Sequence, residues 1–115
     1  MASSHRKNKG TNDNVKVFVR IRPFNEQEIS AARGSLPQRC TLLASSDTLL
    51  SSIHPESKLQ HQFPFDRVFW SIPGDQVATS SVAYTDQAEV YEQMGVPVLN
   101  SAFEGYNGCI FAYGQ

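Results

Sequence analysis

The residues best suited to bind a ligand include a glycine near the end of the printed sequence. Gly114 follows an apolar run over residues 109–113, and Gln115 comes next. A glycine at the carboxyl end of a buried strand can open a phosphate-binding loop, because that loop needs positive φ angles and bare backbone N–H groups. Gly114 and Gln115 could therefore begin a G-x-x-x-x-G-K-[ST] loop. Taken alone, a glycine in this place is more often an ordinary turn residue.

A second candidate group lies near the start of the chain. Arg20, Arg22 and Pro23 fall at the end of an alternating apolar and polar segment. A guanidinium plane and a proline ring are flat, weakly hydrated surfaces on which a purine base can stack. Without further context, both arginines also fit the solvated face of a half-buried strand.

The elements that must position these residues begin with a strand and a short helix. Apolar residues at 15, 17, 19 and 21 alternate with residues 16, 18, 20 and 22, which predicts a strand over 15–22. Pro23 ends this strand because it has no N–H to donate. Asn25 is placed to cap a helix over 26–33, with acidic residues in its first turn and Gly34 just past its end.

The middle of the chain gives weaker patterns. Short apolar pieces between Cys40 and His61 predict a small antiparallel meander. The aromatic-rich residues 63–70 predict a strand that is irregular near Pro64, and residues 71–84 predict a surface loop around Pro73 and Gly74. These elements offer no candidate site residues.

The last third of the chain predicts a helix followed by a strand. Asp86 and Glu89 fit a capping box ahead of apolar residues spaced by three and four, while Gly95 and Pro97 predict a kink or a short break. The segment from Gly105 to Gly108 is expected to end the helix. Residues 108–113 are apolar on both faces, which is typical of a buried central strand in a parallel sheet. A helix, a tight turn and a buried strand form half of a crossover, so the fold class is α/β.

Composition excludes several kinds of partner. The 115 residues carry a formal charge of −1, so no general excess of positive charge favours nucleic acid or anionic lipid. Residues 1–13 are polar and read as a disordered tail. Cys40 and Cys109 are far apart with no CxxC spacing, which favours reduced thiols over a metal site or a disulfide. The sequence has neither a membrane-spanning run nor a secretory signal, so we expect an intracellular protein without membrane insertion.

Several of these segments together resemble one family. The stretch Gly-Tyr-Asn-Gly-Cys-Ile-Phe-Ala-Tyr-Gly-Gln at 105–115 looks like the lead into the phosphate loop of kinesin motor domains. The segment 19–25 resembles the Arg-x-Arg-Pro motif of that family on the adenine side, and 65–69, 90–91 and 102–107 resemble intervening blocks. The likeness covers roughly residues 14–115. Trp70 and the Ala-Phe-Glu-Gly-Tyr-Asn block at 102–107 are similar to the cargo-carrying transporter subfamily.

This resemblance implies the amino-terminal part of a P-loop motor domain, with a mixed central sheet flanked by helices, over residues 14–115. It implies ATP with Mg²⁺ as cofactor, microtubules as partner, and a place in the cytoplasm on the cytoskeleton. A coiled coil and any dimer contacts are expected outside these residues. Arg20 and Pro23 would flank the adenine, Arg22 would support that edge, and Gly114 with Gln115 would open the phosphate loop.

The resemblance carries over no catalytic and no metal-binding residue. In the family pattern the loop lysine, the Mg²⁺-holding Ser or Thr and both switch segments follow the position of Gln115. The family hydrolyses ATP, but we expect no turnover from these residues alone. Two other hypotheses stay open: a short non-catalytic interaction protein derived from a motor domain, and an unrelated α/β module that matches both motifs by chance.

Overall fold

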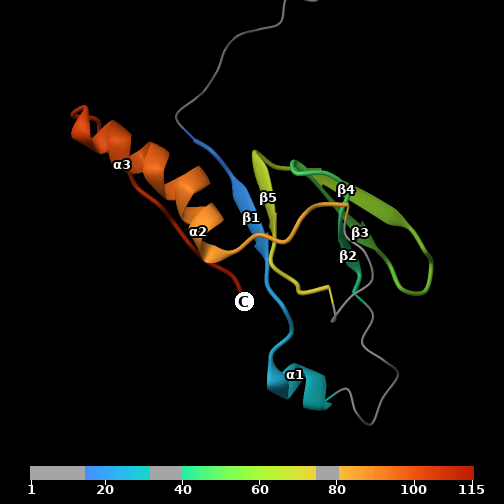
Figure 1. Ribbon diagram of the computed structural model, residues 1–115. Coiled ribbons are helices and arrows are strands. Elements are labelled where there is room, and N and C mark those ends of the chain that lie inside the picture. Colours follow the sequence, from blue (N-terminus) through green and yellow to red (C-terminus); the bar gives the residue numbers. More distant parts are fainter. Residues whose placement is uncertain (1–14, 32–39, 75–80) are drawn as a thin grey trace, which may run out of the picture.

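The computed structural model describes residues 15–31, 40–74 and 81–115, and it forms two small sheets with helices beside them (Figure 1). Strand β1 (Phe18–Ile21) pairs in parallel with β5 (Arg67–Trp70). Strands β2 (Leu42–Ala44), β3 (Leu49–Ile53) and β4 (Gln60–Pro64) form an antiparallel sheet in the order β2-β3-β4. The combination of parallel and antiparallel pairing with helices confirms the mixed α/β class, and the meander predicted between residues 40 and 61 is present.

The helical segments are α1 (Glu26–Ala31), α2 (Gln87–Val90), a π-helical turn η2 (Tyr91–Gly95) and α3 (Val96–Phe103). Figure 1 places β1 and β5 between the meander on one side and the α2–α3 stretch on the other. The parallel pair is therefore the element that connects the two halves of the fold.

The two faces of the parallel pair pack differently. Val19 and Ile21 of β1 pack with Val68 and Trp70 of β5 against the meander, in a cluster that also contains Ala44, Leu50 and Ile72. On the opposite face Phe18 and Phe69 stack with ring centroids 5.8 Å apart and planes 6° from parallel. This alternation confirms the predicted period of two, because neighbouring residues in a strand point to opposite faces.

The first predicted strand is shorter than expected. Val15 and Val17 are 69% and 52% exposed, and the ladder begins only at Phe18. Asp66 makes two hydrogen bonds to the backbone of Val17. The Asp66 N–H donates to the Val17 carbonyl, and Asp66 Oδ2 accepts from the Val17 N–H. The pairing of β1 with β5 therefore begins just after these contacts of Asp66 with Val17.

The prediction of one aromatic strand over residues 63–70 is wrong. Pro64 ends β4 at the edge of the meander, and β5 begins at Arg67 in the other sheet. The two sheets stay in contact because the Val68 N–H donates to the Asp47 carbonyl at 2.7 Å. The following loop is also more buried than predicted, because Ser71 and Ile72 are each only 4% exposed; residues 75–80 lie outside the described ranges.

Helix α1 begins where the sequence predicted. The Glu28 N–H donates to Asn25 Oδ1 at 2.8 Å, and the Asn25 N–H donates to Glu28 Oε2 at 2.8 Å. This reciprocal pair is a capping box, which satisfies two N–H groups that the helix itself leaves unpaired. The expected end at Arg33 and Gly34 lies outside the described residues.

The helical stretch from Gln87 to Phe103 begins at the predicted cap, and it continues through Gly95 and Pro97 without a break. Asp86 accepts a hydrogen bond from the Glu89 N–H at 2.9 Å. The Glu89 carboxylate, however, contacts Arg67 and Gln93 instead of completing the capping box. At Gly95 and Pro97 the backbone keeps helical angles and passes through the π-helical turn, with the proline in the first turn of α3. A wider hydrogen-bond register accommodates the missing proline N–H, so no break is needed.

Helix α3 ends in a Schellman motif. Gly105 has φ of 95°, its N–H donates to the Ala102 carbonyl, and the Tyr106 N–H donates to the Ser101 carbonyl, both at 3.0 Å. A positive φ is easily adopted only by a residue without Cβ, so a glycine is required at this position. The predicted stop at the glycines is confirmed.

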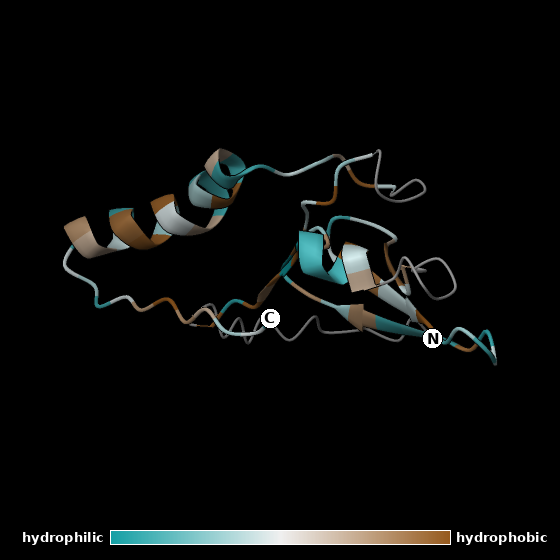
Figure 2. Cartoon of the chain, turned by 90° about the horizontal axis from the view of Figure 1, so that it is seen from below, coloured by the Kyte–Doolittle hydropathy of each residue, from teal (hydrophilic) through white to brown (hydrophobic). Residues whose placement is uncertain are grey.

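The predicted strand over residues 108–113 is not formed. The segment runs back from the tip of α3 toward β1 as an unpaired chain (Figures 1 and 2). Ile110, Phe111 and Tyr113 are 46%, 85% and 98% exposed. A strand that is apolar on both faces needs hydrogen-bonded neighbours and cover, and within the described ranges no strand pairs with it.

Candidate functional site

The carboxyl end of β1 opens into a pocket of about 330 Å³. Three of the five predicted site residues line it, namely Arg20, Arg22 and Gln115. The remaining lining comes from the end of β1, from α1 and from the start of the meander: Ile21, Phe24, Glu28, Cys40, Thr41, Leu42 and Ile72. The structure thus brings together residues that are far apart in the sequence, at the strand end where α/β folds commonly bind ligands.

Arg22 is held by the first turn of α1. Its Nη1 and Nη2 donate to the two carboxylate oxygens of Glu28 at 2.9 and 2.8 Å, and Nη1 also donates to the Pro23 carbonyl at 2.9 Å. This two-point contact raises the pKa of Arg22. The hydrogen bond from Arg22, helped by the Asn25 N–H, lowers the pKa of Glu28 to about 2, so the pair is charged at neutral pH.

Arg20 is held by the segment that leads into α2. Its Nε donates to Ser71 Oγ at 2.9 Å, and its Nη1 donates to Gln87 Oε1. The Ser71 hydroxyl in turn donates to the Thr85 carbonyl at 2.7 Å, in the buried interior. One guanidinium therefore contacts both the residue that follows β5 and the first residue of α2.

The other two predicted residues lie beside the pocket. Pro23 follows Arg22 and is half-buried, and its carbonyl accepts from that arginine. Gly114 has φ of 119° with open space where a Cβ would stand. Its backbone has the left-handed conformation that the opening glycine of a phosphate loop was expected to have, while Gln115 reaches the pocket.

Sequence reasoning did not single out Glu28, which lines the pocket, nor Ser71 and Gln87, which hold the Arg20 guanidinium. Glu28 could have been found, because Asn25 followed three residues later by Glu is the spacing of a capping box. Gln87 and Ser71 carry no local signal, since their roles depend on the pairing of β1 with β5. Cys40, whose Sγ donates to the Leu42 carbonyl at 3.0 Å, also borders the pocket.

The charged side chains that line the pocket determine which ligand would suit it. Its two guanidiniums and one carboxylate leave an excess of positive charge, which favours an anionic ligand with a flat ring. Among the described residues, no three His, Cys, Asp or Glu side chains are grouped so that they could hold a metal ion. No chemical step through a metal is assigned to these residues.

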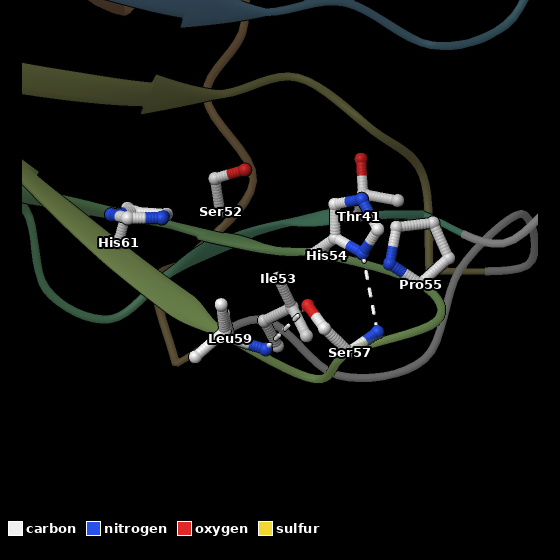
Figure 3. Close-up of a pocket in the computed structure, with 8 residues that line it drawn as sticks. All are labelled: Thr41, Ser52, Ile53, His54, Pro55, Ser57, Leu59 and His61. Atoms are coloured by element: carbon white, nitrogen blue, oxygen red, sulfur yellow. Dashed lines mark hydrogen bonds between the residues drawn. The ribbon is translucent and has the colours of Figure 1, made fainter.

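A second pocket lies on the meander and has a structural explanation. Figure 3 shows His54 and His61 along its lining, with His54 turned toward the loop that joins β3 to β4. His54 Nδ1 accepts from the N–H groups of Glu56 and Ser57 at 3.3 and 3.2 Å. These bonds stabilise the turn in which Lys58 has φ of 59°. The His54 imidazole thus has a structural role in the loop between β3 and β4.

None of the helices in the described ranges is both long and apolar enough to cross a membrane.

Comparison with known proteins gives one consistent family. The model of the kinesin motor domain matches residues 20–115. The kinesin-like protein unc-104 of Caenorhabditis elegans is 43% identical over 101 residues, and KIF1A of Rattus norvegicus is 39% identical over 101 residues. Each match covers 88% of this chain, which spans only 6% and 5% of those two proteins.

Solved structures agree with the sequence matches. A structure of KIF14 with ADP in complex with a microtubule is similar with a TM-score of 0.68 and 34% identity. A KIF14 dimer with AMP-PNP in complex with a microtubule is similar with a TM-score of 0.66 and 35% identity. Both similarities cover 88% of this chain and 25% of the solved chain.

Proposed function

Because the chain belongs to the kinesin motor domain family, we propose that residues 14–115 form the base-binding part of an ATP-driven microtubule motor. One observation carries the proposal: Arg20, Arg22 and Gln115 line a single pocket although they come from opposite ends of the chain. A purine base and the phosphates of one nucleotide need both segments within reach of each other. An unrelated module with two accidental motifs would have no reason to bring them together.

The proposed roles come from the family resemblance, and the contacts of each residue support them. Arg20 and Pro23 flank the adenine, and Arg22, fixed by Glu28, supports the same edge of the base. Gly114 presents bare backbone to the phosphates in its left-handed conformation, with Gln115 beside the pocket. ATP supplies the phosphoryl group for hydrolysis, whereas these residues bind and orient the base and the first part of the phosphate chain. Mg²⁺ would need ligands beyond those described.

The partner and location follow from the family. We propose that the motor acts on microtubules in the cytoplasm, and the KIF14 structures in complex with microtubules support this. The block at residues 102–107 favours the cargo-carrying subfamily. Any dimer would form through regions outside these residues.

The first test is equilibrium binding of ATP to the 115-residue chain, followed by nuclear magnetic resonance of the backbone amides. We expect weak binding, in the millimolar range, with shifts at Arg20, Arg22 and Gln115. Tripolyphosphate should shift Gln115 and its neighbours but leave the β1 amides unchanged, because it has no base. Shifts confined to the meander, or no shifts with either compound, would reject the site.

The second test is the coding sequence that follows Gln115. An in-frame Thr-Gly-Ser-Gly-Lys-Thr, or a near relative of it, would complete a phosphate loop and support the motor. A stop codon at that place would favour the alternative of a short non-catalytic interaction protein. One observation favours that alternative, namely the exposure of Phe111 and Tyr113 at 85% and 98%.

A further inference from the structure

Arg20 in β1 and Arg22 just after it are each held by a residue in the first turn of a helix. Arg22 is held by Glu28, in the first turn of α1. Arg20 is held by Gln87, the first residue of α2, and by Ser71, just after β5. The carboxyl end of β1 and the residue after it are therefore tied to two different helices through the side chains expected to meet a nucleotide.

The geometry of these bonds leaves the binding surface of Arg20 intact. The N–H groups of a guanidinium point outward in its own plane, so hydrogen bonds to Ser71 Oγ and Gln87 Oε1 occupy its edge. A purine base stacks on the flat face of the same group. Protein contacts and base contacts are thus compatible on one side chain.

Two contacts to different nitrogen atoms also fix the orientation of the plane. A bond at Nε alone leaves the group free to swing as the rest of the side chain rotates, and a second bond at Nη1 removes that freedom. Ser71 is a firm anchor because it is 4% exposed and its hydroxyl donates to the Thr85 carbonyl at 2.7 Å. Gln87 is exposed, so its contact with Arg20 can be changed with little effect on the core.

We propose that Gln87 is a positioning residue for the nucleotide base, which acts by holding the Arg20 guanidinium in the plane that stacks on adenine. The inference rests on the proposed function, because it assumes that Arg20 meets the base. It adds a residue from α2 to a site that the sequence assigned only to β1 and to the end of the chain.

The variant Gln87→Met tests this, since methionine has a similar length and helix propensity but no oxygen acceptor. The variant Gln87→Glu keeps an acceptor and should retain positioning, because a carboxylate accepts strongly from a guanidinium. The matched control is Gln62→Met, because Gln62 is also exposed and lies on β4 outside the lining of this pocket. Two measurements are made on the 115-residue chain: the order of the Arg20 Nε–H group by nuclear magnetic resonance relaxation, and the affinities for ATP and tripolyphosphate.

We expect Gln87→Met to increase the mobility of the Arg20 Nε–H and to weaken ATP binding roughly three- to tenfold, the cost of immobilising one long side chain on binding. Tripolyphosphate affinity should not change, and Gln87→Glu and Gln62→Met should behave like the parent. An Arg20 group as ordered in Gln87→Met as in the parent would overturn the inference. So would unchanged ATP affinity despite a mobile Arg20.

The outcomes separate the inference from the proposed function. If the parent chain binds ATP and Gln87→Met binds it equally well, only the role of Gln87 is rejected. If the parent binds neither ATP nor tripolyphosphate, the nucleotide site itself is rejected and the inference is rejected with it. Equal losses of ATP and tripolyphosphate binding in Gln87→Met would indicate general loss of structure and would also overturn positioning.

Discussion

Truncation of Phe69 tests the packing that holds β1 in place. The ring is 1% exposed and stacks on Phe18 of β1 at 5.8 Å, on the same face of the strand as Arg20. A buried Phe→Ala change costs about 3–5 kcal/mol through lost transfer energy and the remaining cavity. With a urea m-value of about 2 kcal/mol/M for a small domain, the midpoint of unfolding should fall by roughly 2 M.

The assay uses a probe that the chain already contains. Trp70 is the single tryptophan, is 4% exposed and lies next to Phe69, so its fluorescence reports on this part of the core during urea unfolding. The matched control is Phe111→Ala, because that ring is 85% exposed and its removal should change the free energy of unfolding by no more than about 0.5 kcal/mol.

A second variant keeps the test decisive if Phe69→Ala does not fold. Total stability of small domains is only about 5–15 kcal/mol, so the alanine variant could lose most of it. Phe69→Leu keeps an apolar side chain and leaves a smaller cavity, so it should cost less than Phe69→Ala. If Phe69→Ala and Phe111→Ala lower the free energy of unfolding by the same amount, the packing of β1 on β5 is not what the contacts indicate.

Three further predictions concern the helix ends and the ion pair. Asp86→Ala should cost about 1 kcal/mol in urea unfolding by removing the cap on the Glu89 N–H, and Asp86→Asn should restore most of it. Gly105→Ala should cost about 1 kcal/mol in the same assay, because φ of 95° strains a residue with a Cβ. The folded pKa of Glu28, about 2, lies below its ordinary value of 4.5, so the unfolded chain binds more protons between these values. Stability should therefore fall as the pH drops from about 4.5 toward 2, and Glu28→Gln should remove that part of the pH dependence; a carboxyl resonance of Glu28 that titrates near 4.5 in the folded chain would contradict this.

The sequence predicted best those elements whose pattern is local. The alternation around Val19 and Ile21, the cap at Asn25 and the glycine stop at Gly105 depend on residues a few positions apart, and all three are present. The aromatic segment was predicted wrongly because a continuous aromatic run does not show that the chain changes sheets at Pro64. The strand at 108–113 was predicted from its apolar residues alone, yet a strand forms only where another strand pairs with it.

The candidate site shows the same division between local and distant information. Arg20, Arg22 and Gly114 could be selected from motifs, but Ser71 and Gln87 reach Arg20 only because β1 pairs with β5 and β5 leads into α2. These partners matter because an arginine that is already oriented loses less freedom when a base binds. In the proposed nucleotide site, the base side is organised by contacts within the protein before any nucleotide binds. On the proposed phosphate side, Gly114 supplies backbone conformation alone, so we expect the affinity of this chain for ATP to come mainly from the carboxyl end of β1 and the start of α2.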